Sequence, residues 1–154
     1  KAQGRQGLCI LCAQGRKRDF LADPKYLVHK VFALADTTDT GITLMYLPLE
    51  AGAQPPQFKP CAKHPQIAED GFVIYYTDQC PFTCYWVPRV AETAKAHGIP
   101  LKTVHITDRE TAQDLPSPVT TYALFHNGKF VTQGIQSDKK FLKLAGDAGY
   151  KITE

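Results

Sequence analysis

A cysteine–proline pair between a short apolar strand and a helix constrains the fold of this chain most. The strand is predicted at Phe72-Val73-Ile74-Tyr75-Tyr76, a β-branched and aromatic run that opens after Gly71. Cys80 then precedes Pro81, a residue favoured at the first helical position, and helical spacing continues to His97. A thiol at a helix N-terminus faces unpaired N–H groups and the positive end of the helix dipole, which favour thiolate over thiol. We therefore expect Cys80 to be reactive.

The sequence after this helix predicts a small mixed sheet. Pro116-Ser117-Pro118 leads directly into a strand, and Asn127-Gly128 is a strong signal for a two-residue hairpin turn. The expected elements are, in chain order, a strand at 101–106, a short helix at 109–115, strands at 119–125 and 129–132, and a helix that Ser137 or Asp138 begins and that ends at Ala148. The expected order over residues 71–150 is therefore β-α-β-α-β-β-α.

This order, with a proline leading into the first hairpin strand, resembles the thioredoxin fold. In that fold the proline at the position of Pro118 is cis and lies against the redox cysteine, so the resemblance implies a cis Ser117–Pro118 bond beside Cys80. The chain departs from the Cys-x-x-Cys redox motif, because three residues separate Cys80 from Cys84. Helical i,i+4 Cβ atoms are about 5–6 Å apart, whereas disulfide Cβ atoms are about 3.8 Å apart. Three interpretations stay open: a reactive single thiol at Cys80, a Cys80/Cys84 dithiol couple, and a scaffold without redox chemistry.

Composition favours a globular protein in a reducing compartment. The 154 residues suffice for one domain or two small lobes, and the apolar content of 44% is typical of globular chains. The net charge is only +3, and basic residues are scattered apart from Arg16-Lys17-Arg18, so we expect no nucleic-acid partner. No apolar run approaches the ~18 residues of a membrane span, and no signal-peptide pattern is visible. The five cysteines are odd in number and several lie in apolar patterns, which predicts a cytoplasmic protein without a disulfide scaffold.

Residues 1–49 form a smaller unit with the expected order strand-helix-strand-strand. Leu8-Cys9-Ile10-Leu11-Cys12-Ala13 is a continuous apolar run, typical of a strand buried on both faces in a largely parallel sheet. Asp23-Pro24 predicts a helix start, with an N-cap and a first-turn proline. About fifty residues bury little apolar surface. We therefore expect this unit to pack against sequence before Lys1 or against another chain.

Residues 50–70 separate this unit from the second one. They are rich in Pro, Ala and Gln and show little periodicity, so we expect a linker there and a second domain at 71–154.

Both units resemble parts of one enzyme family. Residues 1–49 look like the C-terminal part of a GNAT-superfamily N-acetyltransferase, and residues 58–150 are similar to the YoaP-like domain at the C-terminus of some bacterial members. The stretches that carry the first resemblance are Lys1-Ala2-Gln3-Gly4 with Gly7-Leu8-Cys9, Phe20-Leu21-Ala22-Asp23 through Tyr26 to Phe32, and Leu44-Met45-Tyr46-Leu47. Those that carry the second are Phe58-Lys59-Pro60-Cys61-Ala62-Lys63, Cys80-Pro81-Phe82-Thr83, Gly98-Ile99-Pro100-Leu101-Lys102 and Phe125-His126-Asn127-Gly128-Lys129-Phe130. The fold implied is α/β, with a partial GNAT lobe before a thioredoxin-like domain.

The resemblance implies acetyl transfer from acetyl-CoA to the amine of a small molecule or peptide. It places the backbone of Leu11, Cys12 and Ala13 along the pantetheine arm and Asp23 near the cofactor, and it makes Tyr26 the nearest candidate for the acid that protonates the CoA thiolate. The family binds the pyrophosphate on a Gly-rich turn at a helix N-terminus. This chain has no counterpart of that turn, so we expect it to bind acetyl-CoA weakly or not at all on its own.

Two other classes of function stay open: a thiol-redox or thiol-binding module centred on Cys80 and Pro118, and a non-catalytic domain that recognises the transferase's substrate. We expect no metal. Cys9 and Cys12 resemble half a zinc site, but an odd offset along a strand points side chains to opposite faces. His105 and His126 show no partner in the sequence, so we expect structural roles for both.

Overall fold

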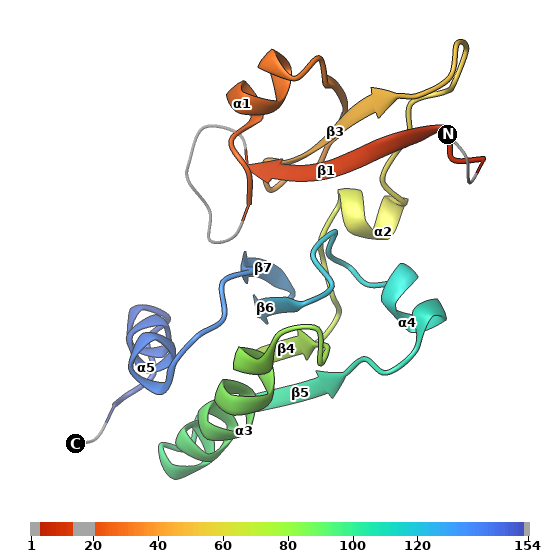
Figure 1. The fold of residues 1–154 in the computed structure, drawn as a ribbon. Helices are drawn as coiled ribbons and strands as arrows, with labels where there is room; N and C mark the ends of the chain where they lie inside the picture. The colour runs from red at the N-terminus through yellow and green to blue at the C-terminus, as the bar shows by residue number, and fades with distance from the viewer. Residues whose placement is uncertain (1–3, 14–20, 153–154) are drawn as a thin grey trace. The chain divides into compact units, whose positions relative to one another are not determined.

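A computed structural model describes residues 4–13 and 21–152 and divides the chain into two compact units, Lys1–Pro65 and Gln66–Glu154 (Figure 1). Each unit has its own β-sheet with helices, so the chain is mixed α/β. The basic triplet Arg16-Lys17-Arg18 and part of the first resemblance, at Lys1-Ala2-Gln3 and Phe20, lie outside the described residues.

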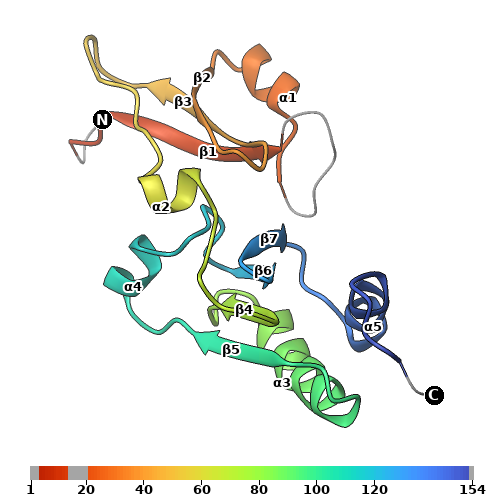
Figure 2. The same ribbon diagram turned by 180° about the vertical axis from the view of Figure 1, so that it is seen from behind.

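The first unit is built on a three-stranded antiparallel sheet. Its elements are β1 (Gly7–Ala13), α1 (Pro24–His29), β2 (Ala33–Thr37) and β3 (Ile42–Pro48). The strands lie in the order β1-β3-β2, so β3 is central and pairs with both neighbours (Figure 2). On one side of this sheet the side chains of Cys12, Leu27 and Met45 form a small buried cluster.

The expectation that the first strand lies buried on both faces in a largely parallel sheet is wrong. β1 is antiparallel to β3, with Leu8 opposite Leu47, and Leu8 is 50% exposed. Cys9 is also exposed, whereas Cys12 and Ala13 at the other end of the strand are buried. A continuous apolar run determines neither the direction of the neighbouring strand nor whether other elements cover one or both faces of the sheet. Here the run forms a strand at the edge of the three-stranded sheet.

Asp36 in β2 fastens a later segment to this sheet. Lys63 donates from Nζ to Asp36 Oδ1 at 2.7 Å, and the backbone N–H of Phe58 donates to Oδ2 at 3.0 Å. The hydrogen bond from Lys63, followed by those from the backbone N–H groups of Phe58 and Thr37, holds the pKa of Asp36 below its ordinary value. Residues 58–63 therefore belong structurally to the first unit.

That fastened segment lies inside residues 50–70, where we expected a linker. It contains the short helix α2 (Pro60–Lys63), and the boundary between the two compact units follows at Pro65. Beyond the boundary, Gln66 bridges to Lys129 and the N–H of Ile67 donates to the carbonyl of Gly128, so these residues join the second sheet.

The second unit has the element order expected from its sequence. Its elements are β4 (Phe72–Tyr76), α3 (Pro81–Ala96), β5 (Leu101–His105), α4 (Arg109–Gln113), β6 (Tyr122–His126), β7 (Lys129–Thr132) and α5 (Asp138–Asp147). The sheet order is β5-β4-β6-β7, in which β4 and β5 are parallel and the other pairs are antiparallel. A right-handed crossover through a helix is the usual connection between such parallel neighbours, and α3 supplies the helix here.

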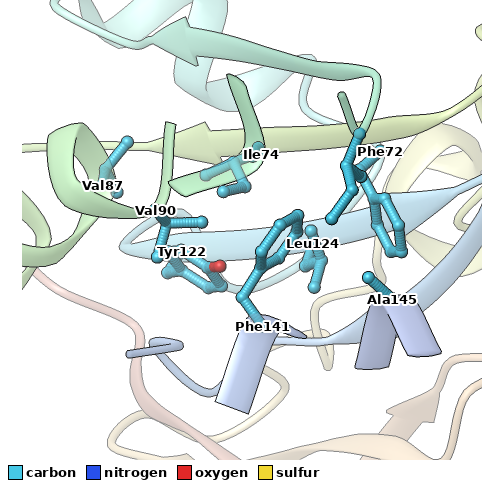
Figure 3. Packing of buried hydrophobic residues seen from close by; sticks show 10 residues of the cluster. Phe72, Ile74, Val87, Val90, Tyr122, Leu124, Phe141 and Ala145 are labelled. Atoms are coloured by element: carbon cyan, nitrogen blue, oxygen red, sulfur yellow. The ribbon is translucent and has the colours of Figure 1, made fainter. Parts of the chain in front are cut away.

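Alternation along β4 and β6 divides the buried residues of this unit between the two faces of the sheet. On one face, Figure 3 shows Phe141 of α5 pointing among Ile74, Tyr122 and Leu124. The rings of Phe141 and Phe72 meet edge to face, with centroids 5.1 Å apart. The residues of this main core are Phe72, Ile74, Val87, Val90, Ala94, Ile99, Tyr122, Leu124, Phe141 and Ala145. A second cluster of Val73, Ala123 and Phe125 lies on the opposite face.

The predicted hairpin at Asn127-Gly128 is confirmed. Both residues have positive φ, 47° and 80°, which suits a tight turn between β6 and β7. A Cβ atom at Gly128 would also lie 2.8 Å from the carbonyl oxygen of Ile67, so glycine is required for space as well as for conformation.

The implied cis bond at Ser117–Pro118 is wrong, because no cis peptide bond occurs among the described residues. The Ser117 Oγ lies 3.2 Å from both the carbonyl oxygen and the N–H of Val119. These contacts form a local turn around Pro118, in which the Ser117–Pro118 bond is trans. An X–Pro bond favours the trans form by about 0.5–1 kcal/mol.

Candidate functional site

One group of polar residues in the second unit lies where its two parallel strands end. Tyr76 ends β4, His105 ends β5, and the two residues lie in register with each other. Asp78 follows β4 by two residues in the turn that leads to α3. The carboxyl ends of parallel strands in α/β sheets are where ligands usually bind, particularly where the connection changes direction. Here β4 has parallel β5 on one side and antiparallel β6 on the other.

Asp78 is the centre of a hydrogen-bonded cluster. His105 Nε2 lies 2.9 Å from Asp78 Oδ1, and Cys84 Sγ donates to the same oxygen at 3.3 Å. The ring of Tyr76 stacks on the imidazole of His105, with centroids 4.7 Å apart and planes inclined by 13°. No partner for His105 was visible in the sequence, and the structure supplies one in Asp78. Its partner lies 27 residues earlier in the sequence and is brought near by the register of β4 and β5.

The surroundings of Tyr76 in this cluster also change its pKa. Desolvation, followed by the nearby Asp78 carboxylate and Cys84, raises the pKa of Tyr76. Tyr76 therefore stays a neutral phenol at ordinary pH, while the hydrogen on His105 Nε2 points at Asp78. Because a carboxylate oxygen accepts, Nε2 of His105 is the donor in this contact.

Cys80 lies at the N-cap of α3, as expected. Its backbone is extended, with φ −125° and ψ 125°, and its half-buried side chain makes no capping hydrogen bond. Thr83 holds the turn instead. Its side chain is fully buried, and its hydroxyl lies 2.7 Å from the carbonyl oxygen of Thr77 and 2.6 Å from that of Cys80. The Thr83 hydroxyl thus holds the backbone of Cys80 at the start of the helix, and the Cys80 thiol takes no part in capping.

Cys84 lies exposed one turn further along the helix. Pro88 follows four residues later inside α3 and has no N–H for the Cys84 carbonyl. The hydrogen bonds of the preceding turn connect it to Thr121, through Thr77 N–H to Thr121 O at 3.2 Å and Thr121 Oγ1 to Gln79 Oε1 at 3.3 Å. The structure therefore ties the cysteine turn to the residue before β6, three residues beyond Pro118.

His126, the second histidine expected to be structural, packs in the core of this unit. Its ring stacks on Phe72 at 4.3 Å, and its Nε2 lies 3.5 Å from the Tyr150 hydroxyl.

In the first unit, the candidate residues lie around the start of α1. Asp23 is the N-cap of this helix and accepts from the Lys25 N–H at 2.8 Å. Tyr26 is 61% exposed, and the Lys30 ammonium lies 5.8 Å from its ring centroid. An exposed phenol on the first turn of a helix is accessible to a ligand.

The positions on β1 expected to lie along the pantetheine arm are less accessible than Tyr26. Cys12 is fully buried, Ala13 is buried and Leu11 is half-buried. Cys12 pairs with Thr43 of β3 and also bridges to Ala22, so both edges of the strand are occupied there. Desolvation, with the negative charge of Asp23 as a smaller cause, raises the pKa of Cys12.

Neither a metal centre nor a membrane span emerges from the described part of the chain. Residues 4–13 and 21–152 contain no group of three His, Cys, Asp or Glu side chains placed to hold a metal ion. Within the same ranges, no helix is long and apolar enough to cross a membrane. All five cysteines are free thiols.

Two known sequences or families are similar to this chain: one family model and one protein of Bacillus subtilis. The YoaP-like family model matches residues 100–143, from β5 into α5. Over 144 residues the chain is 35% identical to a protein of Bacillus subtilis (strain 168) named Uncharacterized N-acetyltransferase YoaP. These matches relate the chain to an N-acetyltransferase. The alignment covers 94% of this chain, hence both units, and the chain spans 57% of that relative's length. No solved structure matches the chain significantly.

Proposed function

We propose that this chain is part of a cytoplasmic acetyl-CoA-dependent N-acetyltransferase, with a partial GNAT lobe in its first unit and a YoaP-like accessory domain in its second. The observation that carries the proposal is the 35% identity to a protein named as an N-acetyltransferase, because the alignment runs through both units. The acceptor would be the amine of a small molecule or peptide.

The surface of the first unit supports a role as part of a larger lobe. Four apolar side chains in or next to α1 and β2 are strongly exposed: Tyr26 at 61%, Val28 at 58%, Val31 at 75% and Leu34 at 58%. Several strongly exposed apolar side chains within one short stretch of sequence fit a surface that packs against another part of the protein or another chain. We propose that further sequence or another chain covers them in the active transferase.

Helix α1, which begins at the candidate residue Asp23, is a poor site for the pyrophosphate of acetyl-CoA. Helix α1 has only six residues, and its N-terminus is already capped by the Asp23 carboxylate, which would repel a phosphate. The edge of β1 at Cys12 is bridged to Ala22. We therefore assign this chain a supporting role in cofactor binding, with Tyr26 as the proposed proton donor, and assign no base.

The topology of the second unit supports a thioredoxin-like accessory domain. The sheet order β5-β4-β6-β7, with one parallel and two antiparallel pairs and with α3 and α5 contributing to one core, is the arrangement that this proposal requires. The trans bond at Pro118 is a departure from that fold.

A specific observation also favours a second function, thiol exchange at Cys80. The cluster of Asp78, Cys84 and His105 surrounds the beginning of the same helix, at the sheet edge where ligands bind. A recognition domain without chemistry, the third possibility, would leave this cluster without a role.

The test of the transferase proposal is an acetylation assay on the complete gene product. The coding sequence upstream of Lys1 is read first for a Gln/Arg-x-x-Gly-x-Gly/Ala turn. The protein is then supplied with acetyl-CoA and a panel of amines, and released CoA thiol is measured. Tyr26→Phe should lower kcat about 10²- to 10⁴-fold with little change in KM, as expected for loss of a general acid. Absence of both the turn and CoA release would contradict the proposal.

A further inference from the structure

Helix α3 carries two different sets of side chains. Its buried residues, among them Val87 and Val90 (Figure 3), pack into the main core of the second unit. A second set recurs in alternating steps of three and four residues, which places its members along one side of the helix. This exposed stripe consists of Phe82, Tyr85, Arg89, Glu92 and Ala96. The same spacing forms the contact seam between two helices of a coiled coil.

The first half of the exposed stripe is aromatic. Phe82 is 58% exposed and Tyr85 is 49% exposed. The Arg89 guanidinium lies 3.9 Å from the centroid of the Tyr85 ring, and that ring meets Trp86 edge to face, with centroids 4.9 Å apart. Aromatic residues and arginine are enriched at the centres of protein interfaces, and side chains that are already ordered lose less entropy on association. This half of the stripe is therefore suited to contact with another protein.

The second half of the stripe carries one positive and one negative charge. Neither Arg89 nor Glu92 takes part in an ion pair within the described part of the chain, although the two are only three residues apart. Arg89 lies over the Tyr85 ring instead. A complementary partner would place an anionic group beside Arg89 and a cationic group beside Glu92. The same stripe on a second copy of this chain carries both groups.

We propose that two copies of this chain associate through the exposed stripe, with α3 antiparallel to α3 of the second copy and a twofold axis between Val90 and Ala91. Arg89 of each copy then faces Glu92 of the other, so two equivalent ion pairs form. A parallel pair in the same register would place like charges opposite each other, which repel. The charges of the stripe therefore select the antiparallel pair.

The sizes of the remaining side chains fit the same register. One turn further from the axis, the large Tyr85 side chain faces the small Ala96 of the second copy. Phe82 reaches the end of the other helix beside Gly98, which is exposed and has open space around its Cα atom. One side of one helix is a small interface, so the dimer is weak and forms only as the protein concentration rises.

Sedimentation velocity on this chain tests the proposal, between about 5 and about 500 µM, a range that brackets the dissociation constant expected of a small interface. The unaltered chain should shift from monomer to dimer within it. Arg89→Glu turns both ion pairs into repulsions between carboxylates and should raise the dissociation constant at least about tenfold. Glu92→Arg should do the same with two guanidinium groups. Both residues are exposed, so the circular dichroism spectrum of the monomer should not change.

The double variant Arg89→Glu/Glu92→Arg exchanges the ends of both ion pairs and restores them. It should bring the dissociation constant back to within about threefold of the original value, which loss of association by unfolding cannot do. Lys143→Glu is the control, because it makes the same change of charge at an exposed position on α5. It should change the dissociation constant less than about twofold.

Ala96→Trp tests the register separately. It adds bulk at a position that is exposed in the single chain but faces Tyr85 in the dimer, so it should weaken association while the monomer keeps its melting temperature. A monomer over the whole concentration range would overturn the proposal and leave the stripe to a partner of another kind. A dimer that Arg89→Glu does not weaken would place the contact on another face, and a double variant that stays monomeric would refute the antiparallel pairing.

Discussion

Replacing Thr83 with valine tests how the start of α3 is held in place. Thr83 is fully buried, and its hydroxyl lies 2.7 Å from the Thr77 carbonyl oxygen and 2.6 Å from that of Cys80. Valine has nearly the same shape, so the change leaves no cavity. It removes the donor and leaves the Thr77 carbonyl without this partner, which costs about 1–3 kcal/mol.

A methyl group in place of the hydroxyl regains part of that cost by apolar burial, at most about 0.8 kcal/mol. The expected net loss is therefore about 1–2 kcal/mol. For a unit of this size, a urea m-value of about 1 kcal/mol/M turns this into a midpoint lowered by about 1–2 M. Trp86, the single tryptophan of the chain, lies in the same helix, so its fluorescence reports the unfolding of the second unit.

Thr93→Val is the matched control for this variant. It is the same substitution in the same helix, at a half-buried residue whose side chain forms no hydrogen bond in the described structure. It should shift the midpoint by less than about 0.3 M. Equal shifts in the two variants would refute the anchoring role of the Thr83 hydroxyl.

Two further predictions concern stability. The pKa of Asp36 is lowered in the folded state, chiefly by the hydrogen bond from Lys63, so its contribution is present above the unfolded pKa near 3.8 and is lost as pH falls through the folded pKa. Asp36→Asn should accordingly reduce the drop in melting temperature, followed by circular dichroism, between about pH 5 and about pH 3; an unchanged drop would contradict this. Gly128→Ala should destabilise the second unit by more than about 1 kcal/mol in urea, because it adds strain at positive φ and a 2.8 Å contact with the Ile67 carbonyl. Gly149→Ala, which has positive φ but open space, should cost less, and equal costs would leave strain alone as the cause.

The local signals in the sequence predicted the elements of the second unit well. The proline after Cys80 and the Asn127-Gly128 pair act through their own backbone preferences, so neighbours in the sequence suffice to place a helix start and a hairpin. Ser137 likewise caps α5, as its hydroxyl and position suggested.

What the sequence did not predict depends on tertiary partners. The apolar run of β1 is the same whether its neighbour is parallel or antiparallel, and the pairing with β3 decided that. The contact between Asp78 and His105 joins residues 27 apart and exists because β4 and β5 end in register. The predicted ends of two consecutive parallel strands are the one signal that places both residues at a common edge.

The trans bond before Pro118 differs from the cis bond that the resemblance to the thioredoxin fold implied. The preference of an isolated X–Pro bond already favours trans, and the Ser117 hydroxyl stabilises a local turn with Val119 that suits it. The order of the elements agreed with the expectation, whereas this single bond did not.

Calorimetric titration with acetyl-CoA tests the central proposal most directly. We predict no micromolar binding to this chain alone, because the Asp23-capped α1 offers no pyrophosphate site. The complete gene product, with a Gly-rich turn supplied upstream, should bind acetyl-CoA in the micromolar range. Micromolar binding by the chain alone would contradict the supporting role assigned to the first unit, and no binding by the complete product would contradict the transferase itself.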